Sequence, residues 1–206
     1  MDAAQRQLND QIDDATQRLL DTARVIAEPD LRQPSLLPDW TRAHVLGHVA
    51  RSADAMRNLL IGARSGEDRP AYPSAEARVA GIEESAALEA KDLMADLAGA
   101  AMAFRAIARQ LTEEDWQYRV RILDSAPFPA AQLLTRRLVE VELHHCDLGA
   151  GYSPADWPAA FAAMDLAEPM DSQRQDRLAR PHPERPARVA PHAPPPRRAG
   201  WRPFTS

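Results

Sequence analysis

Four stretches of the chain place apolar residues three and four positions apart, the spacing of an amphipathic helix. In the first stretch, Leu8, Ile12 and Leu19 fall on one face, and polar residues fill the positions between them. The third stretch is long enough for a short helix that leads into a longer one. The four stretches are residues 3–27, 42–65, 75–111 and 125–149.

Residues that begin and end helices flank these stretches. Thr41 is a good N-cap for the second helix, and Gly66 is the usual residue of a left-handed C-cap. Pro129 is expected near the first turn of the fourth helix, and Gly149 after its last turn. No segment alternates strongly enough to predict a sheet, although residues 118–123 could be extended. The pattern therefore predicts an all-α protein, an antiparallel four-helix bundle.

The helical pattern stops abruptly before Pro169. Residues 169–206 hold nine of the 18 prolines and eight arginines, against three acidic residues. Such a segment has too little apolar surface to offset the entropy of ordering, so we expect residues 1–168 to form the bundle and residues 169–206 to be a disordered tail. A basic arm for nucleic acid is one interpretation of the tail. We favour an unstructured terminus or the frameshifted translation of a GC-rich gene.

Composition narrows the class of protein. The 206 residues carry a net charge of -5, which gives no general attraction to nucleic acid or to anionic membranes. No apolar run approaches the roughly 20 residues that a membrane span needs, and the N-terminus has no signal-peptide core. Cys146 is the single cysteine, so the chain has no internal disulfide, as in a reducing cytoplasm.

Side chains that could bind a metal lie on two of the predicted helices. Glu140 and His144 are one turn apart at the edge of the apolar stripe of the fourth helix, and His48 borders the stripe of the second helix. Glu142 is expected to point toward solvent, and His145 lies further round the stripe. The three stripe-edge residues fit either a structural histidine and a Glu–His pair, or one divalent metal site. Two nitrogens and one carboxylate suit Zn²⁺ and leave one position for a substrate.

Three segments together resemble a known family. LPDWTRAHVLGHVARSADAMRNLL, YPSAEARVAGIE and LVEVELHHCDLGAGYSPADWP are similar, in order and spacing, to the mycothiol-dependent maleylpyruvate isomerases, which are DinB-like four-helix bundles. The resemblance runs from about residue 11 to residue 158. It implies that His48, Glu140 and His144 bind a metal, typically zinc, and that His44 does not. It therefore favours the metal site over the structural pair.

The resemblance also implies a reaction. Mycothiol, a low-molecular-weight thiol, would bind the metal as a thiolate, because a cation lowers the pKa of a thiol. Addition of the thiolate to the cis double bond of maleylpyruvate, rotation and elimination would give the trans product. Cys146 is then a packing residue. Arg78 could pair with a substrate carboxylate, and Asp147 could orient a ligand imidazole or merely cap a helix.

The chain departs from the family pattern after the bundle. Full-length isomerases of this kind carry a second, smaller α/β domain, which residues 169–206 do not resemble. Three hypotheses follow, and in the first two of them a small thiol is the expected partner. The first is a zinc- and mycothiol-dependent isomerase acting on a small dicarboxylate, or a truncated relative of one. The second is a mycothiol S-transferase that detoxifies electrophiles, and the third is a non-enzymatic metal-binding bundle.

Overall fold

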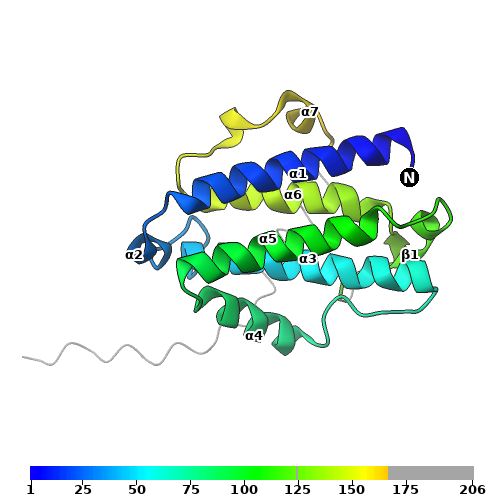
Figure 1. Ribbon diagram of the computed structural model, residues 1–206, viewed down its shortest axis with the longest axis horizontal. Coiled ribbons are helices and arrows are strands. Elements are labelled where there is room, and N and C mark those ends of the chain that lie inside the picture. The colour runs from blue at the N-terminus through cyan, green and yellow to red at the C-terminus, as the bar shows by residue number, and fades with distance from the viewer. Residues whose placement is uncertain (124, 167–206) are drawn as a thin grey trace, which may run out of the picture. The chain divides into compact units, whose positions relative to one another are not determined.

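The computed structural model describes residues 1–123 and 125–166. Within them, four long helices pack as a bundle, which confirms the predicted all-α four-helix fold (Figure 1). The predicted tail, residues 169–206, lies outside the described residues. The bundle helices are α1 (Ala3–Arg24), α3 (Arg42–Ser65), α5 (Ala90–Ala108) and α6 (Gln132–Asp147).

Local sequence signals set the ends of these helices. The side chain of Asp2 caps α1, and the hydroxyl of Thr41 accepts a hydrogen bond from the backbone N–H of His44 at the start of α3. Gly66 adopts φ 72°, a left-handed conformation that ends α3 as predicted. Gly149, at φ 60°, follows the last turn of α6 in the same conformation.

The bundle helices form two parallel pairs. In α1 and α6, later residues of one helix contact later residues of the other: Arg18 contacts Glu142, and Thr22 contacts His145. The helices α3 and α5 are likewise parallel, because α4 (Ala75–Ala86) brings the chain back along the bundle between them (Figure 1). The pairs run antiparallel to each other, so each long helix has one parallel and one antiparallel neighbour.

Short elements connect and cover the bundle. Residues 119–120 and 128–129 pair as β1 (Arg119–Val120) and β2 (Phe128–Pro129), a two-residue antiparallel contact. The first of these strands lies in the segment predicted to be extended, and the second lies in the stretch predicted to be helical. Pro129 therefore lies in a strand, and α6 begins three residues later than Pro129 rather than around it. The remaining elements are α2 (Glu28–Leu31), α7 (Ala159–Ala162) and two 3-10 turns, Asp115–Gln117 and Pro154–Asp156.

The α3 helix is the central element of the fold. It packs against α4, α5 and α6, so most of its side chains are buried, and small residues allow the close approach. Leu46 and Leu59 from α3, Leu97 from α5 and Leu133 from α6 all belong to one buried hydrophobic core. Within the described part of the chain, no helix combines the length and the apolar character that crossing a bilayer requires.

Replacing Gly47 by alanine should destabilise the protein. A Cβ atom at this position would lie 2.8 Å from the Cβ of Ser85 and 3.2 Å from the carbonyl oxygen of Ile82, so α4 would be pushed away from α3. We expect a loss of about 1–3 kcal/mol in the free energy of unfolding. Gly99→Ala is the matched control: no heavy atom lies within 4 Å, and better helix propensity should stabilise by up to about 1 kcal/mol. Urea denaturation of both variants measures the difference, and equal effects would contradict this packing.

Candidate metal centre

Three predicted site residues come together in the seam between α3 and α6. Nε2 of His48 lies 3.0 Å from Oε2 of Glu140, and Nε2 of His144 lies 3.4 Å from the same oxygen. The two imidazole rings are nearly perpendicular, with centroids 4.6 Å apart. One potential ligand atom from each residue lies within 4.8 Å of the other two. These three are the one such group of His, Cys, Asp or Glu found among residues 1–123 and 125–166.

Helix geometry explains this convergence. Glu140 and His144 are one turn apart on α6, so their side chains leave the helix on the same side. The antiparallel packing of α3 on α6 then places His48 opposite them. His48 and His144 are buried, and the side chain of Glu140 keeps 12% of its surface exposed. The cluster thus lies below the surface with its carboxylate nearest to solvent.

Burial and mutual contact determine the charges in the cluster. Burial, reinforced by the neighbouring His144, lowers the pKa of His48 to about 3, so this imidazole is neutral at pH 7. Burial alone would raise the pKa of Glu140, but hydrogen bonds with His144 and His48 hold it well below its usual range. Burial also opposes the charged form of His144, yet its contacts with Asp147 and Glu140 raise its pKa. A carboxylate therefore faces one neutral and one more basic imidazole.

Asp147 orients one of the imidazoles. Its Oδ2 lies 2.9 Å from Nδ1 of His144, and because a carboxylate only accepts, Nδ1 carries the proton. When this imidazole is neutral, its Nε2 lone pair faces the oxygen of Glu140. A lone pair and an anionic oxygen at 3.4 Å repel unless a proton or a metal cation lies between them. The donor set and its arrangement therefore fit a divalent cation, with Asp147 in the supporting position that metal-binding histidines commonly use.

Aromatic and polar neighbours separate His48 from the other histidine of its helix. The centroid of the Trp40 ring lies 5.5 Å from that of His48. Trp40 can reach this position because it comes just before Thr41, the N-cap of α3. His44, one turn before His48, contacts the hydroxyl of Thr41 and the carboxylate of Glu83 instead. As expected, His44 is not part of the cluster.

The remaining sequence candidates, Arg78 and Cys146, do not join the cluster. The Arg78 guanidinium is 5.7 Å above the ring of Tyr72, within electrostatic range of His48. Cys146 is partly buried, and burial raises the pKa of its thiol, which disfavours the thiolate that a nucleophile would require. The structure therefore gives Cys146 no reactive environment, in line with a packing role.

Sequence reasoning missed Arg137. Its side chain is completely buried in the α3–α6 seam, and Nη1 donates to the carbonyl oxygen of Val49, the residue after His48. Arg137, Glu140 and His144 share one face of α6, at spacings of three and four residues. Burial lowers the pKa of Arg137 to about 10, so it remains charged at pH 7. The i, i+3, i+7 spacing was the signal in the sequence that could have revealed it.

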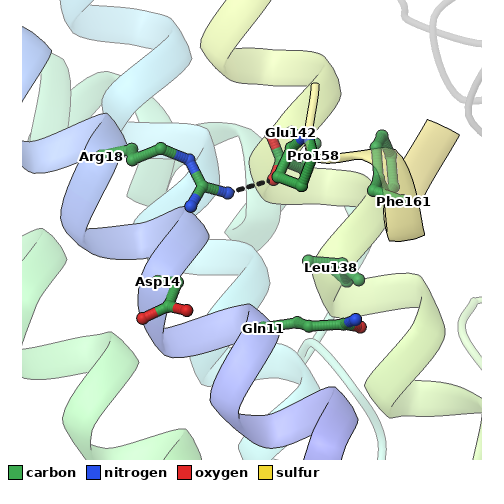
Figure 2. Close-up of a pocket in the computed structure, with 7 residues that line it drawn as sticks. All are labelled: Gln11, Asp14, Arg18, Leu138, Glu142, Pro158 and Phe161. Carbon is green, nitrogen blue, oxygen red and sulfur yellow. Dashed lines mark hydrogen bonds and ion pairs between the residues drawn. The ribbon is translucent and has the colours of Figure 1, made fainter. Parts of the chain in front are cut away.

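The expectation that Glu142 points to solvent is wrong. Its side chain is 1% exposed, in the seam between α1 and α6. Each carboxylate oxygen has one partner: Oε1 accepts from Arg18 and Oε2 from the hydroxyl of Tyr152, both at 2.6 Å. Figure 2 shows the Arg18–Glu142 ion pair. The pocket beside it is lined by Gln11, Asp14, Arg18, Leu138, Glu142, Pro158 and Phe161.

His145 belongs to this second polar cluster. Its Nε2 lies 2.7 Å from the hydroxyl oxygen of Thr22 on α1, and its ring stacks on that of Tyr152, with centroids 3.7 Å apart. Adjacent histidines of α6 thus face different helices: His144 faces α3 and His145 faces α1. Only the first of them reaches the candidate metal centre.

Comparison with known proteins gives a consistent result. A sequence profile described as the mycothiol maleylpyruvate isomerase N-terminal domain matches residues 12–149. Among solved structures, a mycothiol-dependent maleylpyruvate isomerase is similar at 28% sequence identity, and a histidine-to-alanine mutant of such an enzyme at 27%, both with a TM-score of 0.72. Each comparison covers 76% of this chain but 65% of the solved chain. No curated protein sequence matches.

Glu142→Gln should destabilise the bundle although it preserves shape. The amide keeps one acceptor but removes the counter-ion of Arg18, whose side chain is 36% exposed, so water screens part of the lost attraction and we expect a cost of roughly 1–2 kcal/mol. Asp21→Asn is the control, because it neutralises the exposed ion pair with Arg24 and should change stability by less than about 0.5 kcal/mol. Thermal and urea unfolding of the two variants tests this difference. A Glu142 variant as stable as the Asp21 variant would show that the buried pair contributes nothing.

Proposed function

The chain belongs to the mycothiol maleylpyruvate isomerase N-terminal domain family, and from this premise we propose that it is a zinc- and mycothiol-dependent enzyme that isomerises a small cis-unsaturated dicarboxylate by reversible thiol addition. The convergence of His48, Glu140 and His144 is the observation that carries the proposal. The matched region spans all three residues, and they come from the helices that the family resemblance predicts.

The three converging side chains would hold the metal. Two neutral imidazoles and one carboxylate are typical of catalytic zinc, which keeps a coordination position open for a ligand. A bound zinc ion would supply Lewis acidity, stabilising a thiol as its thiolate near neutral pH. This chemistry needs no cysteine of the protein, in agreement with the environment of Cys146.

Residues around the cluster would prepare it for a ligand. Asp147 accepts the Nδ1 proton of His144 and so keeps Nε2 directed at the metal position. Trp40 and the apolar side chains of the α3–α6 seam keep water from the buried side of His48. Arg78 would meet a substrate carboxylate from the side of α4, because guanidinium groups bind carboxylates in a bidentate manner.

Zinc binding should depend on His144 but not on its neighbour. His144→Ala removes one of three ligands, so the zinc content of the purified full chain should fall from roughly one ion per chain to nearly none. His145→Gln keeps a polar partner for Thr22 and should retain the metal. Elemental analysis by mass spectrometry after dialysis measures the ratio. The same comparison applies to His48→Ala and His44→Ala.

Two outcomes of this measurement would contradict the proposed site. One is full zinc content in His144→Ala, and the other is equal loss in the His144 and His145 variants. Circular dichroism of each variant separates loss of a ligand from loss of the fold. If the wild-type protein binds no zinc but is folded, the Glu140 cluster is a structural hydrogen-bond network.

Activity with two substrates distinguishes the possible reactions. The zinc-loaded full chain, mixed with mycothiol, should convert maleylpyruvate to its trans isomer, and the change in absorbance measures the rate. Glu140→Ala should lower kcat/KM by at least about 100-fold because the metal is lost. Reaction with a thiol-conjugating electrophile such as chlorodinitrobenzene, without isomerisation, would instead indicate an S-transferase. Inactivity toward both, with zinc bound, would leave a metal-binding bundle without this catalysis.

A further inference from the structure

The buried charge of Arg137 has no matching counter-ion in the described part of the chain. Nη1 donates to the carbonyl oxygen of Val49 at 2.8 Å, whereas Nε and Nη2 are buried without a hydrogen-bond partner there. A buried, ionised group with unsatisfied donors is expensive, and proteins retain such groups chiefly at functional sites. An uncompensated guanidinium beside a candidate metal centre therefore needs an explanation.

The nearest acidic groups already have other partners. Arg137 lies within electrostatic range of Glu140 and Asp54. Asp54 pairs with Arg51 at 3.2 Å and with Arg57 at 3.7 Å on the outer side of α3. Glu140 contacts both cluster histidines and would ligate the cation. When a divalent cation occupies the centre, the negative charge of Glu140 is no longer available to balance Arg137.

Counting charges around an occupied centre leaves a positive excess. A divalent cation and Arg137 contribute three positive charges, and Arg78 adds a fourth from the side of α4. Glu140 and Asp147 contribute two negative charges. A bound thiolate would cancel one further positive charge, which leaves a net charge of about +1. The centre therefore still favours a ligand that brings a negative charge.

We propose that Arg137 is a specificity-determining residue, whose buried guanidinium makes the metal centre select ligands that carry a carboxylate over neutral ligands of the same shape. It acts through its charge and its two unsatisfied donors rather than as a metal ligand. The inference rests on the metal site proposed above and refines its substrate class. Arg78 could contact the carboxylate directly, whereas Arg137 supplies a fixed charge from within the helix seam.

Removing the charge should weaken anion binding without removing the metal. Arg137→Met keeps an unbranched apolar side chain, and we expect the zinc content to stay at the wild-type level because a like charge near the cation is gone. Affinity of the zinc-loaded full chain for maleate, measured by calorimetry without any thiol, should fall by at least about tenfold. The dimethyl ester of maleate, which has the same skeleton without charge, should bind the wild type and the variant equally.

Neighbouring and milder substitutions serve as controls. Arg136→Met removes an arginine that stacks on the ring of Phe128, 4.3 Å away, and should leave maleate affinity unchanged. Arg137→Lys keeps a cationic group but loses the planar set of donors, so it should weaken maleate affinity less than Arg137→Met does. If Arg137→Met does not fold, Arg137→Gln provides a second neutral variant that can still donate to Val49.

The results separate the role of charge from a structural role. Equal weakening of maleate and of its diester by Arg137→Met, or unchanged maleate binding, would overturn the proposal. So would a wild-type protein that binds maleate no better than the diester. Selective maleate binding that depends on Arg137, in a protein that fails to isomerise maleylpyruvate, would support this inference while refuting the proposed reaction.

Discussion

The antiparallel contact between α3 and α6 is the interaction on which the site depends. It buries a carboxylate, two imidazoles and a guanidinium in a seam otherwise filled by aliphatic side chains. Desolvating these groups is costly, and their mutual hydrogen bonds offset only part of that cost. Replacing a buried ion pair by apolar side chains often leaves stability unchanged or raises it, so the polar seam supports the proposed three-ligand metal centre better than a purely structural role.

The helix α6 carries a polar group on each of two opposite sides. Toward α3 it presents Glu140 and His144, and toward α1 it presents Glu142 and His145. On the α1 side, Arg18 and Tyr152 satisfy both oxygens of Glu142, while Nε of Arg18 and Nδ1 of His145 are buried without a hydrogen-bond partner. On the α3 side, Arg137 keeps two buried donors without partners, and a neutral His144 would direct its Nε2 lone pair at the carboxylate of Glu140. The α3 side is distinguished by its donor set, two imidazoles and one carboxylate whose potential ligand atoms lie within 4.8 Å of one another, and it is therefore the side that we propose as the metal site.

The family relationship and the physical reading of the site support each other from independent directions. The profile match covers the bundle from residue 12 to residue 149 and includes the three candidate ligands. The chain spans 65% of the length of the solved isomerases that it resembles, so the match leaves about a third of those enzymes without a counterpart in the aligned region. The isomerase reaction therefore has to be tested on this chain itself.

Much of this protein could be read from its sequence alone. Helical periodicity and the caps at Thr41 and Gly66 were sufficient for the bundle and for the ends of α3, because these signals act within a single turn. The spacing of Glu140 and His144 placed both on one face of α6 for the same local reason. The resemblance to a known family correctly identified the family, and it favoured a metal site formed by His48 with these two residues, which stays a proposal.

Tertiary structure decided which polar side chains are buried, because burial depends on how many neighbouring helices surround each helix. The apolar stripe of residues 132–147 predicts one buried face for α6. The helix in fact contacts both α1 and α3, so Glu142 is buried and ion-paired instead of solvated. The same double contact buries Arg137 beside the candidate metal centre. The periodicity of one helix reports its own faces, whereas the number of neighbours that cover those faces, and the charges they bring, is set only when the chain has folded.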